Sequence, residues 1–265
     1  MTVKSVGMVI NIARFLENIS HSKWRFAPVV ALAVVGLLVQ HPMHQRVFIG
    51  ATGAMIRSRV AERLAKTFTR DTGVAAVVVR ITFALSAPGG QPLDIALAHR
   101  GETLSAPNAG AAASESLVAS RFVIVGPSSD PADVRDTRSA LDAIRRIQNN
   151  EAPFRPAPAG TAASALEEKL WREAGVPPPS PSLYDTMDAA LTDASECDAY
   201  MLVDRLSYDH LPSNLTVLFS GGGALQDQYV AVKLASAPDR RAARAFWTWL
   251  RSDRGRTVVR QLASR

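Results

Sequence analysis

Strand-like and helix-like segments alternate along this chain from residue 46 onward, and this alternation constrains the fold more than any other feature. Short runs rich in β-branched residues, typical of strands, occupy residues 47–51, 74–81, 94–99 and 121–127. A segment with helical periodicity separates the first two runs. Because two parallel strands need a crossover between them, usually a helix, this order indicates an α/β architecture with mainly parallel sheets.

The segment between the first two strands predicts one long amphipathic helix. Apolar residues at positions 56, 60, 64 and 68 recur every four residues, which places them on one face of a helix. Gly73 is expected to end it, since glycine readily takes the left-handed conformation found at helix C-termini. The preceding turn, GATGA at 50–54, joins strand to helix. A helix N-terminus carries unpaired N–H donors and partial positive charge, so such a turn favours an anion.

A change of composition after residue 127 predicts a second lobe. Helical patterns there alternate with proline-rich segments, and further strands are expected at 199–204, 215–220 and 228–234. A pair of helices ends the chain. The predicted organisation is therefore a first lobe from residues 46–125 and 222–265 and a second lobe from residues 126–221.

The N-terminal region predicts export. Residues 26–39 form an uncharged apolar run preceded by Lys23 and Arg25. The run has the length of a signal-peptide core and is short for a full membrane span. We therefore expect residues 1–45 to be a signal peptide or an N-terminal membrane anchor. The expected location is periplasmic, or anchored in the inner membrane and facing the periplasm. The single Cys197 excludes an intrachain disulfide.

Catalytic and metal-binding patterns do not stand out from the sequence. The five histidines are scattered without zinc-ligand spacing, and neither a nucleophile elbow nor a phosphate loop is found. The prediction is a chain that is not an enzyme and has no metal and no cofactor. The formal net charge of +6 suits an anionic partner. Arginines crowd the last stretch, but no nucleic-acid-binding signature of interleaved basic and aromatic residues accompanies them, so no nucleic-acid partner is predicted.

Four segments, taken in order, carry a family resemblance. They are RFVIVGPSSDPADV (121–134), APF with AGT (152–161), AYMLVDRLSY (199–208) and AFWTWLRSDRGR (245–256). In these segments the chain, from Val47 to its C-terminus, resembles the substrate-binding proteins of bacterial tungstate ABC importers. The resemblance implies a two-lobed periplasmic-binding-protein fold that closes around an oxyanion such as tungstate or molybdate. It also implies an ABC permease as partner.

The same resemblance carries over ligand-binding residues, with departures. At the first turn, where the family is rich in threonine and serine, only Thr52 keeps a hydroxyl. At the second turn, Phe83 follows the threonine in place of a glycine. In the second lobe both aspartates and a serine of the family pattern are missing after Arg155. Asp188 replaces a glycine and brings a carboxylate towards the expected anion. The implied ligand-binding residues are Thr52, Gly53, Thr82, Arg155, Gly160, Thr161 and Met187.

Two alternatives stay open at this point. Thr52 and Thr161 each stand just before a helix, where a threonine commonly caps the helix with its own hydroxyl. Arg155 fits either the charge partner of the anion or an ordinary surface arginine. For the whole chain, the alternative function is a membrane-anchored sensor or interaction domain, resembling a binding protein, with a changed or lost ligand.

Overall fold

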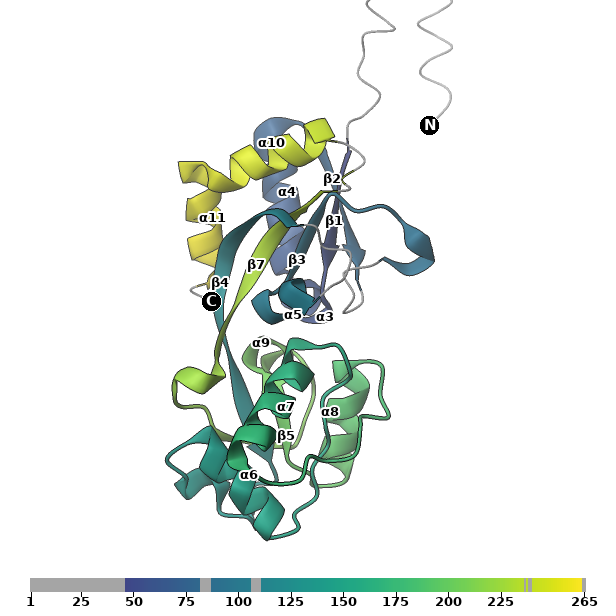
Figure 1. The fold of residues 1–265 in the computed structure, drawn as a ribbon. Coiled ribbons are helices and arrows are strands. Elements are labelled where there is room, and N and C mark those ends of the chain that lie inside the picture. The colour runs from purple at the N-terminus through teal and green to yellow at the C-terminus, as the bar shows by residue number, and fades with distance from the viewer. Residues whose placement is uncertain (1–45, 82–86, 106–110, 236, 238–239, 264–265) are drawn as a thin grey trace, which may run out of the picture. The chain divides into compact units, whose positions relative to one another are not determined.

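The computed structural model describes residues 46–81, 87–105, 111–235, 237 and 240–263, which belong to one compact unit. The predicted leader at 1–45, with its apolar run at 26–39, and the predicted ligand residue Thr82 lie outside the described residues. Within the described ranges, no helix is both long and apolar enough to cross a membrane. Separate hydrophobic clusters define lobe I (residues 46–121 and 226–263) and lobe II (residues 122–225), the upper and lower halves of the unit in Figure 1.

Lobe I is built on a sheet with helices on its faces. Its strands are β1 (Arg46–Ala51), β2 (Ala75–Arg80), β3 (Ile95–His99), β7 (Gln226–Leu234) and the first part of β4 (Ala111–Gly126), in the order β2-β1-β3-β7-β4. Its helices are α3 (Gly53–Arg57), α4 (Val60–Thr72), α5 (Arg100–Ser105), α10 (Arg240–Arg251) and α11 (Asp253–Ala263), with a 3-10 turn η2 at Pro88–Gly90. β1 pairs parallel with β2 and β3, whereas β7 runs antiparallel to β3 and β4.

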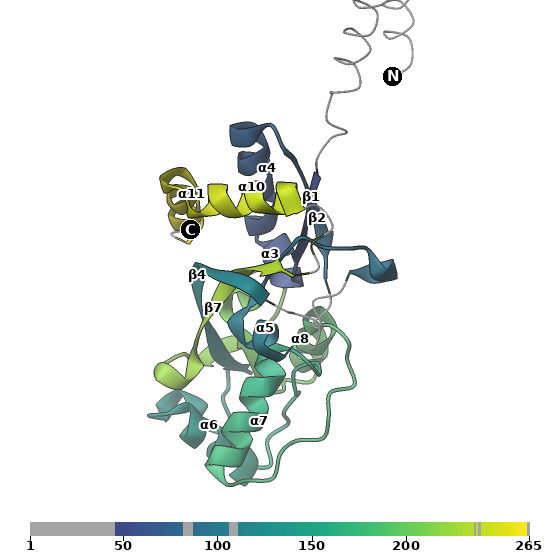
Figure 2. The same cartoon turned by 45° about the horizontal axis from the view of Figure 1, so that its top comes forward.

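Helices α4, α10 and α11 cover one face of this sheet (Figures 1 and 2). Phe68 of α4 makes edge-on ring contacts with Phe246 and Trp249 of α10, at centroid distances of 5.1 and 5.5 Å. Successive side chains of a strand point to opposite faces, so Ile95 joins this helix-covered cluster while Ala96 joins the cluster on the other face. All five side chains are buried.

The amphipathic segment of lobe I differs from the single helix expected. It is divided into α3 and α4 at Arg59, whose φ of 58° is left-handed. Ser58 Oγ donates to the Ala54 carbonyl at 2.8 Å and satisfies an acceptor at the end of α3. The apolar stripe itself is confirmed, because Leu64 and its predicted neighbours on α4 are buried. Gly73 ends α4 with φ 74°, as predicted.

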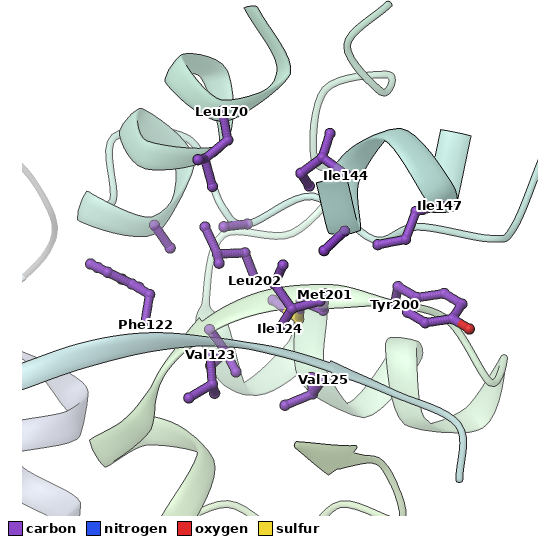
Figure 3. Packing of buried hydrophobic residues seen from close by; sticks show 14 of the residues in the cluster. Phe122, Val123, Ile124, Val125, Ile144, Ile147, Leu170, Tyr200, Met201 and Leu202 are labelled. Carbon is purple, nitrogen blue, oxygen red and sulfur yellow. The ribbon is translucent and has the colours of Figure 1, made fainter. Parts of the chain in front are cut away.

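Lobe II surrounds the second part of β4. Its elements are η3 (Val134–Asp136), α6 (Ala140–Asn149), α7 (Ala162–Ala174), α8 (Met187–Glu196), β5 (Met201–Asp204), α9 (Arg205–Asp209), β6 (Thr216–Phe219) and η4 (Gly223–Leu225). Figure 3 shows Ile144 and Ile147 of α6 and Leu170 of α7 facing Ile124 and Leu202 on the strands; each is at most 1% exposed. Burial of such side chains supplies most of the stability of a lobe of this size.

The expected two-lobed α/β fold is confirmed, but the prediction of a mainly parallel sheet does not hold for the pairing in lobe II. β5 and β6 both pair antiparallel with β4, which lies between them. The reason is that β4 enters lobe II from lobe I and takes a central position there. The parallel partner of this region is reduced to an isolated bridge between Phe154 and Tyr200.

β4 is the element shared by the two lobes. Residues 111–121 pair with β7 in lobe I, and residues 122–126 pair with β5 and β6 in lobe II. The strand can be followed from the upper to the lower half of Figure 1. Its register shifts between Ser116 and Val118 and again between Ile124 and Val125. Bulges of this kind bend a strand and increase its twist, which allows one strand to serve two sheets.

Candidate ligand-binding site

A cavity of about 150 Å³ lies between the two lobes. Lobe I contributes the turn after β1 and the carboxyl ends of β2 and β3, and lobe II contributes the N-terminal ends of α7 and α8. Ligands of open α/β sheets typically bind at the carboxyl ends of the strands. The residues lining the cavity are Thr52, Gly53, Ala54, Arg57, Arg80, Ile81, His99, Glu102, Phe122, Thr161, Ala163, Asp185, Thr186, Met187, Asp188, Asp204, Ser207 and Tyr229.

The two threonines of the cavity have different roles. Thr161 caps α7: its hydroxyl accepts from the Ser164 N–H at 2.9 Å and donates to the Pro158 carbonyl at 2.8 Å. Thr52 stands before α3, yet its hydroxyl makes no capping bond. That hydroxyl is buried and has no hydrogen-bond partner among the described residues. An unsatisfied buried hydroxyl costs free energy, so Thr52 is a group that a ligand would satisfy.

Arg57 brings a positive charge to the cavity from α3. Its Nη1 donates to Asp188 Oδ2 at 2.8 Å and lies 2.6 Å from Asp188 Oδ1, across the gap between the lobes. Its Nη2 lies 3.5 Å from Ser207 Oγ. The side chain is 16% exposed, and its Nε–H is buried without a partner in the described part of the chain. Arg57 therefore retains one donor that is not used.

His99, the last residue of β3, forms part of the floor of the cavity. Its ring nitrogen Nδ1 lies 2.7 Å from Asp227 Oδ2, and its Nε2 lies 3.8 Å from Asp204 Oδ1. The longer distance is an ion pair and not a hydrogen bond. Burial alone would lower the pKa of His99, but the carboxylates of Asp204 and Asp227 outweigh it and raise the pKa to about 10. At neutral pH the ring is thus a buried cation.

The proton on His99 has a consequence for the cavity. With Nδ1 engaged by Asp227, the second proton of the imidazolium is on Nε2, which is buried and has no hydrogen-bond partner among the described residues. This N–H lies 3.8 Å from Asp204 Oδ1, too far for a hydrogen bond, and is a third buried donor without one among the described residues, beside those of Thr52 and Arg57. The tilted ring of Tyr229, 4.0 Å away between centroids, holds the imidazole in place.

Two buried acidic residues that line the cavity, Asp204 and Glu102, accept hydrogen bonds from partners within the protein. Asp204 caps α9 by accepting from the Ser207 N–H at 2.8 Å, and it accepts from the Tyr229 hydroxyl at 2.8 Å. Burial would raise the pKa of Asp204, but His99 and Ser207 lower it to about 2. Glu102 accepts from the backbone N–H of His99 at 3.2 Å, and burial raises its pKa. These carboxylates build the floor of the cavity and hold the cation in it.

The structure brings some of the predicted site residues together and leaves others apart. Thr52, Gly53, Thr161 and Met187 line the cavity. Arg155 and Gly160 do not line it; Arg155 forms an ion pair with Asp193 of α8, and Gly160 is an exposed turn residue with φ 77°. Thr82 lies outside the described residues. The ligand-binding roles of all seven stay predictions.

Sequence reasoning missed Arg57 and His99. Arg57 lies one helical turn after the Gly53–Ala54 start of α3, so its position beside the same turn was readable from the sequence. His99 ends a predicted strand, and the carboxyl end of a strand is where ligands of α/β sheets gather. The partners that make His99 a cation come from β5 and β7 and were not readable. The expected carboxylate of Asp188 does lie in the cavity.

Comparison with known proteins shows which proteins have a similar sequence and fold. No family model matches the sequence. Over 233 residues the chain is 23% identical to the tungstate-binding protein TupA of Peptoclostridium acidaminophilum, in an alignment covering 80% of each protein. The structure of the tungstate ABC transporter from Geobacter sulfurreducens superposes with a TM-score of 0.67 at 22% identity, covering 82% of this chain and 98% of that one. The chain has the fold of the tungstate-type binding proteins.

Further relatives agree with this tungstate-type fold. The tungstate-binding protein TupA from Desulfovibrio alaskensis G20 superposes with a TM-score of 0.61 at 23% identity, over 80% of this chain and 92% of that one. A putative ABC transporter anion-binding protein of Haloferax volcanii is 28% identical over 152 residues, which cover 52% of this chain and 44% of the relative. These similar proteins are named for binding and transport rather than for catalysis.

Proposed function

We propose that the chain binds a small oxyanion between its lobes and serves as the solute-binding component of an ABC importer outside the cytoplasmic membrane. The names of the similar proteins support tungstate as the ligand and an ABC transporter as the partner, whose permease would receive the ligand. Molybdate is proposed beside tungstate as an oxyanion of the same kind. One observation carries the proposal: three buried donors, which have no hydrogen-bond partner among the described residues, belong to side chains that line one cavity. They are the Thr52 hydroxyl, the Arg57 Nε–H and the His99 Nε2–H.

Donors of this kind match the chemistry of an oxyanion. A dehydrated oxyanion presents only acceptor oxygens, so it needs N–H and O–H groups around it. Each hydrogen bond to a charged group contributes about 1.5 to 3 kcal/mol. Two of the three donors are on cations, Arg57 and His99, which gives the charge as well as the bonds. The nearby carboxylates of Asp204 and Glu102 already accept hydrogen bonds within the protein.

The test is thermal denaturation of the full chain with tungstate, molybdate, sulfate, phosphate and acetate, followed by calorimetric titration. A ligand at 100 times its Kd stabilises the folded protein by about 2.7 kcal/mol, which shifts the midpoint measurably. We expect at least one tetrahedral oxyanion to stabilise the chain and acetate to do so less. The proposal would be refuted if none of the four tetrahedral oxyanions stabilised the chain.

Two arginine variants identify the charge partner. Arg57→Gln removes a cavity-lining cation that has a buried N–H without a partner among the described residues, and Arg155→Gln removes the cation that the family resemblance implied. Arg155 serves as the matched control, because its ion pair with Asp193 also involves α8 but lies away from the cavity. We expect Arg57→Gln to abolish oxyanion-induced stabilisation and Arg155→Gln to retain it. The reverse pattern would assign the anion to Arg155 and reject this cavity.

A further inference from the structure

Asp188 occupies an unusual position for a residue of an anion site. Its carboxylate is bound by Arg57 from the opposite lobe, at 2.6 and 2.8 Å, and it projects from the first turn of α8 into the same cavity. A carboxylate is itself a small oxyanion. The Asp188 carboxylate therefore binds the cation that an incoming anion would need, and it is tethered beside that cation by the chain.

At α7, too, a carboxylate of the chain occupies a position that an anionic ligand could take. Glu102 of lobe I reaches across to lobe II, where its Oε1 lies 3.5 Å from the backbone N of Ala162 at the start of α7. The N–H groups at the start of a helix are natural donors to an anion. Across the cleft, Asp188 thus pairs with an arginine side chain and Glu102 approaches a backbone N–H at a helix start. Both kinds of donor commonly bind anions.

The two carboxylates differ in how easily a ligand can replace them. Glu102 is buried, accepts a second bond from the His99 N–H and belongs to the floor of the cavity. The Asp188 side chain is 45% exposed, and Arg57 is its ion-pair partner among the described residues. Released from Arg57, the Asp188 carboxylate can turn to solvent. Asp188 is therefore the group that an entering anion displaces.

We propose that Asp188 is a specificity-determining residue that competes with the ligand for Arg57. This inference rests on the proposed oxyanion binding and describes how the chain regulates it. A tethered group acts at a high effective concentration, so a free anion binds only if it gains more than Asp188 loses. A carboxylate ligand merely repeats the contact of Asp188. An oxyanion with further oxygens also reaches Thr52 and His99, and so is favoured.

The test compares Asp188→Asn with Asp185→Asn. Asp185 lines the same cavity, and no ion pair joins it to any described residue, so its substitution removes the same charge without freeing Arg57. Tungstate, molybdate, sulfate and phosphate are titrated by calorimetry into the natural chain and both variants. We expect Asp188→Asn to bind oxyanions about tenfold more tightly, equivalent to about 1.4 kcal/mol, and Asp185→Asn to gain less than about threefold.

The outcomes separate this inference from the proposed function. Oxyanion binding by the natural chain with no gain in Asp188→Asn rejects the inference alone, as does an equal gain in Asp185→Asn. Binding by Asp188→Asn but not by the natural chain supports the competition and rejects oxyanion transport by the natural chain. Binding by none of the three proteins rejects both. Thermal denaturation without ligand confirms that each variant is folded before its titration is interpreted.

Discussion

We expect Glu167 on α7 to make the stability of lobe II depend on pH. Its side chain is buried, and its two carboxylate oxygens lie 3.1 and 3.0 Å from the Ala157 N–H. Burial raises the pKa of Glu167 from 4.5 to about 8, against the opposing effect of the backbone N–H groups of Ala157 and Leu202. The substitution Glu167→Gln removes the ionisable group and keeps the size of the side chain.

The sign and size of the effect follow from linkage. A group whose pKa is higher in the folded state contributes stability that is present below pH 4.5 and is lost as the pH rises through about 8. At about 1.36 kcal/mol for each pH unit, the interval from 4.5 to 8 corresponds to about 5 kcal/mol in full, and to about 4 kcal/mol between pH 5 and pH 9. This is a large part of the stability of an ordinary domain.

The assay is urea unfolding of the full chain at several pH values between 5 and 9, followed by circular dichroism. We expect the free energy of unfolding of the natural chain, minus that of Glu167→Gln, to fall by about 4 kcal/mol over this interval. Contributions from other titrating groups, including His99, cancel in the difference. The matched control is Glu168→Gln. Glu168 follows Glu167 in the chain but is exposed, and its Oε1 lies 3.4 Å from Arg172 Nη1.

The result that would refute the reasoning is a constant difference. If the natural chain and Glu167→Gln lose stability in parallel as the pH rises, Glu167 is ionised throughout and its burial does not control its pKa. The same conclusion follows if Glu168→Gln changes the pH profile as much as Glu167→Gln does.

Four substitutions test other features of the fold and the site. Gly126→Ala should destabilise the chain by about 1 to 3 kcal/mol in urea unfolding, because a Cβ there would lie 2.6 Å from the Tyr200 ring; unchanged stability would contradict this packing. Asp204→Asn should cost about 3 kcal/mol and lower the pKa of His99 in an NMR titration, since a buried cation loses a partner; an unaltered imidazole titration would exclude that role. Thr161→Val should cost about 1 kcal/mol through loss of the α7 cap while oxyanion affinity is kept, whereas Thr52→Val should keep stability and weaken oxyanion binding at least tenfold; equal effects of the two would refute their division of labour.

The parts of the fold that depend on local pattern could be predicted from the sequence. Alternating strand and helix segments, the apolar stripe of α4 and the glycine that ends it are properties of neighbouring residues, and all are found. The break at Arg59 could not be predicted, because a left-handed arginine has no sequence signature. The antiparallel pairing in lobe II depends on which strand crosses between lobes, which is a property of the whole topology.

The site shows the same division between local and distant causes. The turn after β1 was found because a strand followed by a glycine-containing helix start is local. The contrast between Thr52 and Thr161 was not predictable, because both precede a helix and only the three-dimensional backbone decides which hydroxyl meets an N–H. The family motif favours Arg155 as a ligand residue. In the structure Arg155 instead forms a salt bridge with Asp193 of α8 and does not line the cavity.

The passage of β4 through both sheets also bears on how the molecule comes apart. A domain joined by a flexible linker can lose one half and keep the other. Here, melting of lobe II would free the edge of residues 122–126, in direct continuation of the ladder that residues 111–121 form with β7 in lobe I. Loss of strand pairing that starts in one lobe therefore spreads along β4 into the pairing of the other lobe. The two lobes should lose their structure together, as one cooperative transition rather than two.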